Sequence, residues 1–182
     1  ATPAEKHPEN PEPIGRLREL RFDRVSFRHP TATRNAVNEI CFTVNTGETV
    51  AFVGPSGSEK TPLVKLLVGL YEPLEGTVGY NGITHQRIDR SELQSQTGMV
   101  AQDTQLFSGT IRENLLFVNP DASDEACLVA LQQSACQSLL ERAGKGLDTV
   151  IGEGGVKVSG GEKQRLSIAR ALLRKPNLLI FD

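Results

Sequence analysis

A glycine-rich turn lies between two apolar runs of different texture. The first run, 49–53, is continuous and typical of a strand buried on both faces, and the second, 63–68, has a helical pattern. The turn itself reads Gly54, Pro55, Ser56, Gly57, Ser58, Glu59, Lys60, Thr61. Backbone N–H groups in such a turn, with the positive end of the helix that follows, attract phosphate. The stretch therefore predicts a phosphate-binding loop.

The order of strand, glycine-rich turn and helix beginning with Lys-Thr matches the Walker A motif. Lys60 is expected to reach the outer phosphates, and the Thr61 hydroxyl is expected to bind Mg²⁺. Two positions depart from the motif. Glu59 stands where the motif has its last glycine, and Pro62 follows in the first helical turn.

Composition limits the classes of function. A chain of 182 residues with 38% apolar content is long enough for one soluble domain with a real core. The net charge of −2, without a basic block, and the small number of aromatic residues argue against a nucleic-acid-binding protein. No apolar run approaches a membrane span, and the first residues do not resemble a signal peptide. Cys41, Cys127 and Cys136 lack metal-ligand spacing, which favours buried, reduced thiols.

The pattern along the chain predicts an α/β protein. A proline-rich start, 1–18, is expected to be a tail or linker. Alternating residues from 20 to 47 predict strands of an antiparallel layer, with further short strands at 74–82 and 98–102. Helices are expected from Thr110, over 123–133 and over 160–174, and Pro176 ends the last of these.

Three later places in the chain carry residues that suit nucleotide chemistry. Ser159 and Glu162 have the spacing of a capping box, which alone indicates no more than a capped helix. Gly160 and Gly161 between them leave backbone N–H groups open to an anion. Gln102 and Asp182 each end a predicted strand; alone, each is ordinary in an α/β protein.

The order and spacing of these parts resemble the nucleotide-binding domain of ATP-binding cassette (ABC) transporters, over about 20–182. The matching parts are Walker A, the Q-loop glutamine Gln102, the signature loop at 159–162 and a Walker B strand ending at Asp182. Two further stretches, 106–114 and 149–155, look like those of exporter-type members. The resemblance implies a P-loop NTPase (RecA-like) core over 19–182 with a helical subdomain over 103–171.

The resemblance also implies ligands and partners. ATP and Mg²⁺ would bind at Walker A, with Thr61, Gln102 and Asp182 on the metal side. The signature residues Ser159, Gly160, Gly161 and Glu162 would contact the γ-phosphate of ATP held by a second nucleotide-binding domain. The stretch 149–155 would meet the transmembrane domain, which places the chain at the cytoplasmic face of a membrane as an ATPase that drives export.

His29 occupies a position where the family usually has an aromatic residue that stacks on adenine. An imidazole stacks with less area than a phenol ring. A solvated histidine before the turn proline Pro30 is an equally good interpretation of the same residues.

The two departures in Walker A are expected to weaken ATP binding. Two unit charges about 4 Å apart repel by about 1 kcal/mol in water and about 4 kcal/mol at an effective dielectric constant near 20. Glu59 also adds a Cβ where the backbone must approach the ligand. Pro62 removes one N–H donor and biases Thr61 away from helical geometry. An affinity well below that of an ordinary family member follows.

The end of the chain bears on catalysis. In the family a glutamate after the Walker B aspartate acts as general base, and a later loop supplies a histidine to the γ-phosphate. Neither position follows Asp182 in this sequence. Hydrolysis by this chain alone is therefore not expected, and the domain is expected to be incomplete at its C-terminus.

Three rival interpretations remain. A degenerate, non-hydrolysing cassette that acts as a regulatory or structural partner is favoured by Glu59 and Pro62. An ABC ATPase of the chromosome-maintenance type would carry a long coiled coil between Walker A and the signature, which this sequence does not have. A small-molecule P-loop kinase leaves the stretch 159–165 unexplained.

Overall fold

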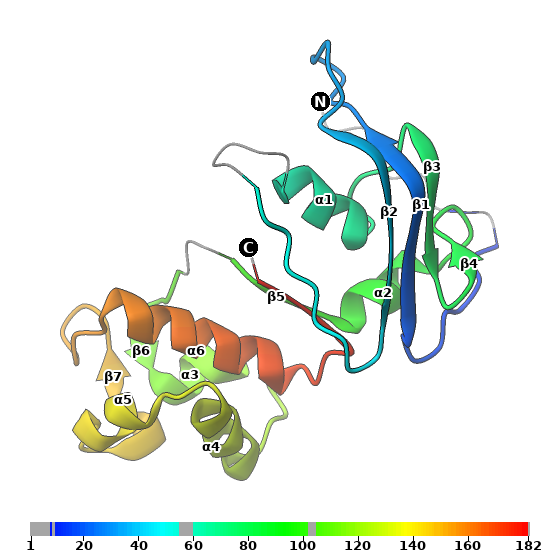
Figure 1. Ribbon diagram of the computed structural model, residues 1–182. Coiled ribbons are helices and arrows are strands. Elements are labelled where there is room, and N and C mark those ends of the chain that lie inside the picture. Colours follow the sequence, from blue (N-terminus) through cyan, green and yellow to red (C-terminus); the bar gives the residue numbers. More distant parts are fainter. Residues whose placement is uncertain (1–7, 9, 55–59, 102–104, 182) are drawn as a thin grey trace. The chain divides into compact units, whose positions relative to one another are not determined.

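The chain divides into two units, one over Ala1–Thr97 and one over Gly98–Asp182 (Figure 1). The computed structural model describes residue 8 and residues 10–54, 60–101 and 105–181. The predicted bounds of the nucleotide-binding domain and of its helical subdomain stay predictions.

The first unit contains a four-stranded sheet in the order β2-β1-β3-β4. Each neighbouring pair is antiparallel, which confirms the predicted antiparallel layer. Leu20 and Phe22 of β1 bury their side chains on either side of the exposed Arg21, as the period of two requires. Phe22 also stacks on Phe42 of β2, with ring centroids 4.5 Å apart. The strands are β1 (Glu19–Phe27), β2 (Val37–Asn45), β3 (Glu75–Tyr80) and β4 (Ile83–Thr84).

Two helices accompany this sheet: α1 (Lys60–Leu67) and α2 (Arg90–Ser95). The side chain of Asp89 caps α2, because its carboxylate accepts from the N–H groups of Ser91 and Glu92. Tyr80 of β3 ties the end of α1 to the sheet. Its hydroxyl donates to the carbonyl oxygens of Leu67 at 2.9 Å and Leu66 at 3.3 Å.

The stretch that precedes β1 is packed and hydrogen-bonded from Glu12 onward, so the expectation of a tail is corrected for residues 12–18 and stays a prediction for the residues before them. Ile14 and Leu17 are each only 5% exposed. The Asn81 amide donates to the carbonyl oxygens of Ile14 at 2.7 Å and Arg16 at 2.9 Å. The burial of Ile14 and Leu17 and the hydrogen bonds of Asn81 thus offset the entropy lost when this stretch becomes ordered. The prolines and charged residues of the stretch had predicted that this entropy loss would keep it disordered.

The run 49–53 is the second correction. It was expected to be a doubly buried strand, but it has no strand assignment and its residues are exposed, with Val53 96% exposed. Phe52 approaches Phe42 edge to face, with ring centroids 5.4 Å apart. No described strand of the first unit pairs with this run. A strand is defined by its hydrogen bonds to a neighbouring strand, and apolar composition alone does not provide that neighbour.

The second unit combines helices with two short strand pairs, β5 with β8 and β6 with β7. The predicted helices over 123–133 and 160–174 are confirmed as α4 and α6, and Ser123 and Ser159 cap them. The strands are β5 (Thr97–Val100), β6 (Gly109–Thr110), β7 (Val150–Ile151) and β8 (Leu178–Phe181). The helices are α3 (Ile111–Leu116), α4 (Asp124–Gln133), α5 (Gln137–Arg142), the 3-10 turn η1 (Gly146–Asp148) and α6 (Gly160–Leu173).

The core of the second unit lies among these helices. Leu166 and Ala169 of α6 are fully buried against apolar residues of α3, α4 and α5. Cys127 and Cys136 belong to this core, as predicted, and burial raises the pKa of both thiols. Cys41 is exposed on β2, which corrects the expectation that all three cysteines are buried.

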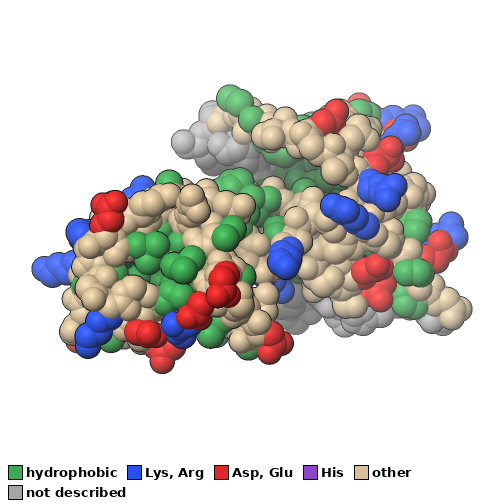
Figure 2. Space-filling model, turned by 90° about the horizontal axis from the view of Figure 1, so that it is seen from below, with side chains coloured by type: hydrophobic (Ala, Val, Ile, Leu, Met, Phe, Trp, Pro, Cys, Tyr) green, Lys and Arg blue, Asp and Glu red, His purple; other side chains and the backbone are tan. Residues whose placement is uncertain are grey.

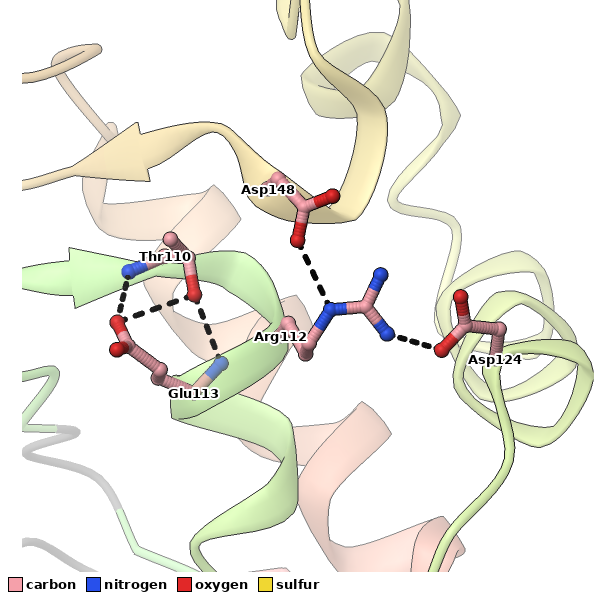
Figure 3. A network of polar contacts seen from close by, with 5 residues as sticks. All are labelled: Thr110, Arg112, Glu113, Asp124 and Asp148. Carbon is pink, nitrogen blue, oxygen red and sulfur yellow. Dashed lines mark hydrogen bonds and ion pairs between the residues drawn. The ribbon is translucent and has the colours of Figure 1, made fainter.

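A polar network at the start of α3 holds three segments together (Figure 3). The Nε of Arg112 donates to Asp148 at 2.9 Å, and the same guanidinium pairs with Asp124 at the start of α4. Beside it, Thr110 and Glu113 form the predicted capping box. Glu113 accepts from the Thr110 N–H at 2.7 Å, and its own N–H donates to the Thr110 hydroxyl at 3.0 Å.

Figure 2 shows hydrophobic side chains exposed among charged ones on one face of the second unit. The exposed apolar residues of α4 include Leu128 and Val129, each about half exposed. Within the described ranges, no helix combines the length and the apolar character that crossing a membrane requires.

Candidate functional site

The predicted phosphate loop is described only at its two ends. Gly54 is exposed at one end, and α1 begins at Lys60 at the other. Pro55, Ser56, Gly57, Ser58 and Glu59 lie outside the described residues. A helix therefore does start at the lysine of the motif, as an anion-binding loop requires.

Thr61 is helical, although Pro62 follows it. This corrects the expectation that the proline biases Thr61 away from helical geometry. Pro62 is the third residue of α1, and in the first turn a helix needs no backbone N–H from it. The hydroxyl of Thr61 belongs to an exposed residue in the first turn of α1. An exposed hydroxyl oxygen is a donor type that suits Mg²⁺.

His29 belongs to an aromatic cluster in the first unit. The His29 ring lies edge-on to Phe27 and to Tyr71, with ring centroids 5.2 Å and 5.5 Å apart. Phe27 itself stacks on Tyr71, with a centroid distance of 4.8 Å. The cluster fixes the imidazole from one side, so His29 is half-buried and not simply solvated. Tyr71 is a member that the sequence did not single out. Tyr71 follows Gly69, at the end of a helix, and this position predicts a turn but not a contact with His29.

The signature residues form the N-terminus of α6. Ser159 is the cap, with extended backbone, and Gly160 and Gly161 are the first two helical residues. All three are exposed. A Cβ added at Gly160 would meet no atom within 4 Å, so the backbone there is open to an approaching group. The first N–H groups of a helix have no partner within the helix, and an anion is a suitable one.

Glu162 completes the capping box and is buried, with 7% of its side chain exposed. Its carboxylate accepts from the Ser159 N–H at 2.8 Å and from the Ser159 hydroxyl at 2.8 Å. Arg142 at the end of α5 pairs with the other carboxylate oxygen. These hydrogen bonds, first of all that from the Ser159 N–H, lower the pKa of Glu162 and keep it ionised at neutral pH.

Arg142 is a residue that sequence reasoning missed. It lies 20 positions before Glu162, and no local spacing relates the two. Only the packing of α5 beside the start of α6 brings the guanidinium to the carboxylate.

The two strands that lead to the remaining candidates pair with each other. β5 ends at Val100 and β8 ends at Phe181, and these strands form one small sheet. Gln102 and Asp182 themselves lie outside the described residues. Among the described residues no group of three or more His, Cys, Asp or Glu side chains is placed to hold a metal ion.

The two stretches that look exporter-like are neighbours in space. β6 and β7 pair antiparallel, with Gly109 opposite Ile151 and Thr110 opposite Val150. The Ser108 hydroxyl accepts from the N–H of Glu153 at 3.4 Å. The stretches 106–114 and 149–155 thus form one continuous feature of the second unit.

Comparison with known proteins identifies the class of domain. A family model described as "ABC transporter" matches residues 37–182. The chain therefore belongs to the ABC transporter family, and its fold is that of the ABC nucleotide-binding domain, a P-loop NTPase fold. The resemblance and the fold class inferred from the sequence are confirmed.

Individual relatives narrow the comparison. "Uncharacterized ABC transporter ATP-binding protein YwjA" of Bacillus subtilis is 44% identical over 175 residues, which are 96% of this chain and 30% of that protein. "Iron-sulfur clusters transporter ATM1, mitochondrial" of Kluyveromyces lactis is 38% identical over 164 residues, 90% of this chain and 23% of that protein.

A solved structure agrees. The "Structure of a bacterial Atm1-family ABC exporter with ATP bound" matches with a TM-score of 0.84 and 35% identity, over 97% of this chain and 31% of that one. The chain thus spans about a third or less of the relatives compared.

Proposed function

We propose that the chain is the ATP-binding domain of an ABC exporter, in which ATP binding and hydrolysis drive transport across a membrane. The observation that carries the proposal is the exposed, serine-capped N-terminus of α6, built from Ser159, Gly160 and Gly161. It stands in a chain that belongs to the ABC family and whose relatives include a structure titled as an exporter with ATP bound.

Each predicted site residue has a role in this proposal. Lys60 binds the outer phosphates through its charge, and Thr61 with Asp182 holds Mg²⁺ through oxygen donors. Gln102 senses the metal or the attacking water. The metal neutralises phosphate charge when bound, and the described end of α1 fits such a complex because a helix N-terminus favours anions.

His29 is proposed to stack on adenine from its position in the cluster with Phe27 and Tyr71. Because a phenol ring offers more stacking area than an imidazole, His29→Tyr is expected to tighten Mg·ATP binding a few-fold.

The partners follow from the same proposal. A second nucleotide-binding domain, identical or different, holds the ATP that Ser159, Gly160 and Gly161 contact. A transmembrane domain docks on the feature formed by 106–114 and 149–155, where Phe107 and Val150 are each more than 40% exposed. The chain then works at the cytoplasmic face of a membrane.

Glu59 is proposed to lower ATP affinity by repulsion of phosphate, and Pro62 by removal of an N–H donor. Charge repulsion of about 1 kcal/mol per phosphate charge corresponds to a several-fold loss. This favours a second candidate function, a cassette that pairs with a competent partner and does not itself hydrolyse ATP.

The test is a Mg·ATP titration of the natural chain and of a chain with Glu59→Gly and Pro62→Thr. We expect the altered chain to bind several-fold more tightly, and Lys60→Ala in the altered chain to abolish that binding. If the altered chain binds no ATP, or binds it equally well without Lys60, the proposed ATP site is wrong. If the natural and altered chains bind equally, Glu59 does not act on the phosphates.

A further inference from the structure

Two capping boxes of the same kind lie in the second unit, and their surroundings differ. In the first box Glu113 accepts from Thr110, the N-cap of α3, and Glu113 is exposed. In the second box Glu162 accepts from Ser159, the N-cap of α6; Glu162 is buried and pairs with Arg142. Within the described residues Glu113 makes no ion pair. The second box is thus a charged pair built into the signature loop, and the first is an ordinary cap.

Both hydrogen-bond donors of Ser159, its backbone N–H and its hydroxyl, bond to the Glu162 carboxylate. An ionised carboxylate only accepts, so the Ser159 hydroxyl, 2.8 Å away, donates to it. The Ser159 N–H donates to the same oxygen at 2.8 Å. Hydrogen bonds to a charged acceptor are about twice as strong as neutral ones. A phosphate at this loop must therefore compete with Glu162 for the serine hydroxyl, and it also meets a like charge.

Arg142 is placed to moderate that competition. Its guanidinium binds the carboxylate oxygen that does not face Ser159, so it draws charge away from the serine. The Arg142 side chain is 51% exposed, so its direct attraction for an anion at the loop is screened by water. Its main effect passes through the buried carboxylate that it touches.

We propose that Glu162 is a latch on the signature serine and that Arg142 is the positioning residue that weakens the latch, so that the pair sets the phosphate affinity of the signature loop. The inference rests on the proposed function in one respect: it takes phosphate as the group that the loop binds. The site itself is located by the signature motif of the family and not by the helix end alone.

The test is a titration of the full chain with inorganic phosphate, followed by the amide NMR shifts of Ser159, Gly160 and Gly161. Glu162→Gln keeps an acceptor of the same shape but removes the charge, and we expect it to tighten phosphate binding about fivefold. The matched control is Glu113→Gln, which makes the same change in the other capping box. It is expected to leave phosphate binding unchanged while thermal unfolding reports a similar loss of capping in both variants.

Arg142→Gln tests the positioning role. We expect it to weaken phosphate binding about fivefold in the natural chain and less than twofold in a chain that already carries Glu162→Gln. A merely structural Arg142 would lower stability but leave the phosphate titration unmoved.

Three results would overturn the inference: no phosphate-dependent shift at the loop in any variant, weaker binding in the Glu162→Gln chain, or an equal Arg142 effect with and without the Glu162 charge. None of these results involves the Walker A loop. The Mg·ATP titration described above can therefore fail while this inference stands, and the reverse also holds.

Discussion

At the scale of single residues, Tyr80 links a strand to a helix through one buried hydroxyl. It is fully buried and donates to the carbonyl oxygens of Leu66 and Leu67. Burial raises the pKa of its phenol, so the donor stays neutral. Tyr80→Phe keeps the ring and removes the donor, so we expect a loss of about 1 kcal/mol in the free energy of unfolding, measured by urea denaturation.

Tyr71→Phe is the control for that substitution. The Tyr71 hydroxyl accepts from the Lys65 ammonium group at 3.2 Å in a half-exposed setting, where water replaces the lost bond. A loss of less than about 0.5 kcal/mol is expected. Equal losses from both substitutions would show that burial of the Tyr80 hydroxyl is not what matters.

The Arg112 network makes a prediction about acid stability. The hydrogen bond from Arg112 lowers the pKa of Asp148 below its ordinary value. A carboxyl whose pKa is lower in the folded protein stabilises the fold above its unfolded pKa, near 4, and that stabilisation disappears as the pH falls through the folded pKa. Arg112→Gln should therefore lower the melting temperature at pH 6, and the difference from the natural chain should vanish as the pH falls below about 4.

Salt distinguishes this explanation from lost packing. Both carboxylates are more than half exposed, so 1 M NaCl should shrink the difference between the natural and Arg112→Gln chains at pH 6. If the difference in melting temperature persists at low pH and in high salt, the stabilisation comes from packing of the apolar part of the Arg112 side chain and not from its charge.

These residues also mark the limit of prediction from sequence. The caps at Thr110 and Ser159 were predicted because cap and partner are three positions apart. Arg112 and Asp148 are 36 positions apart, and Arg142 and Glu162 are 20 apart. Only tertiary packing brings such pairs together, and no local pattern encodes it.

At the scale of elements, the pairing of β1 with β3 requires a glycine in β3, at Gly76, because β1 has a bulge opposite it. The β1–β3 register shifts between Asp23 and Ser26, and Arg24 within that bulge has φ 49°. Gly76 has φ +78°, and a Cβ there would lie 2.2 Å from the Arg24 carbonyl oxygen. Gly76→Ala forces this bulge to move, so we expect a loss of about 3 kcal/mol or more in unfolding free energy.

Gly82→Ala is the matched control, because Gly82 also has positive φ, at +81°, but has open space around it. Only backbone strain of about 1 kcal/mol is expected there. Similar losses at both positions would mean that the backbone conformation, and not the close approach of the two strands, sets the cost.

Element prediction succeeded where the pattern was self-contained and failed where it depended on neighbours. Helices α4 and α6 carry their own caps and apolar spacing, and both were predicted. The run 49–53 has the composition of a central strand, but strand formation needs a paired neighbour that composition does not provide. Ile14 and Leu17 were missed for the opposite reason: they are two apolar residues in a stretch dominated by proline and charge.

At the scale of the whole molecule, the division into two units predicts separate stabilities. Leu166 is fully buried in the core of the second unit, and Leu→Ala changes at such sites cost about 2–5 kcal/mol. Leu166→Ala should speed amide hydrogen exchange in α3, α4 and α6 and leave β1 and β3 unchanged. Leu20→Ala, at a buried site of β1, should do the reverse.

The outcome decides how the domain responds to its ligands. Separate exchange behaviour would mean that the helical unit, which carries the signature loop, can unfold locally without unfolding the four-stranded sheet of the first unit. Faster exchange in both units after either substitution would mean one cooperative structure. In that case a change at the signature loop, such as loss of the hydrogen bonds between Ser159 and Glu162, would change the free energy of unfolding of the whole chain.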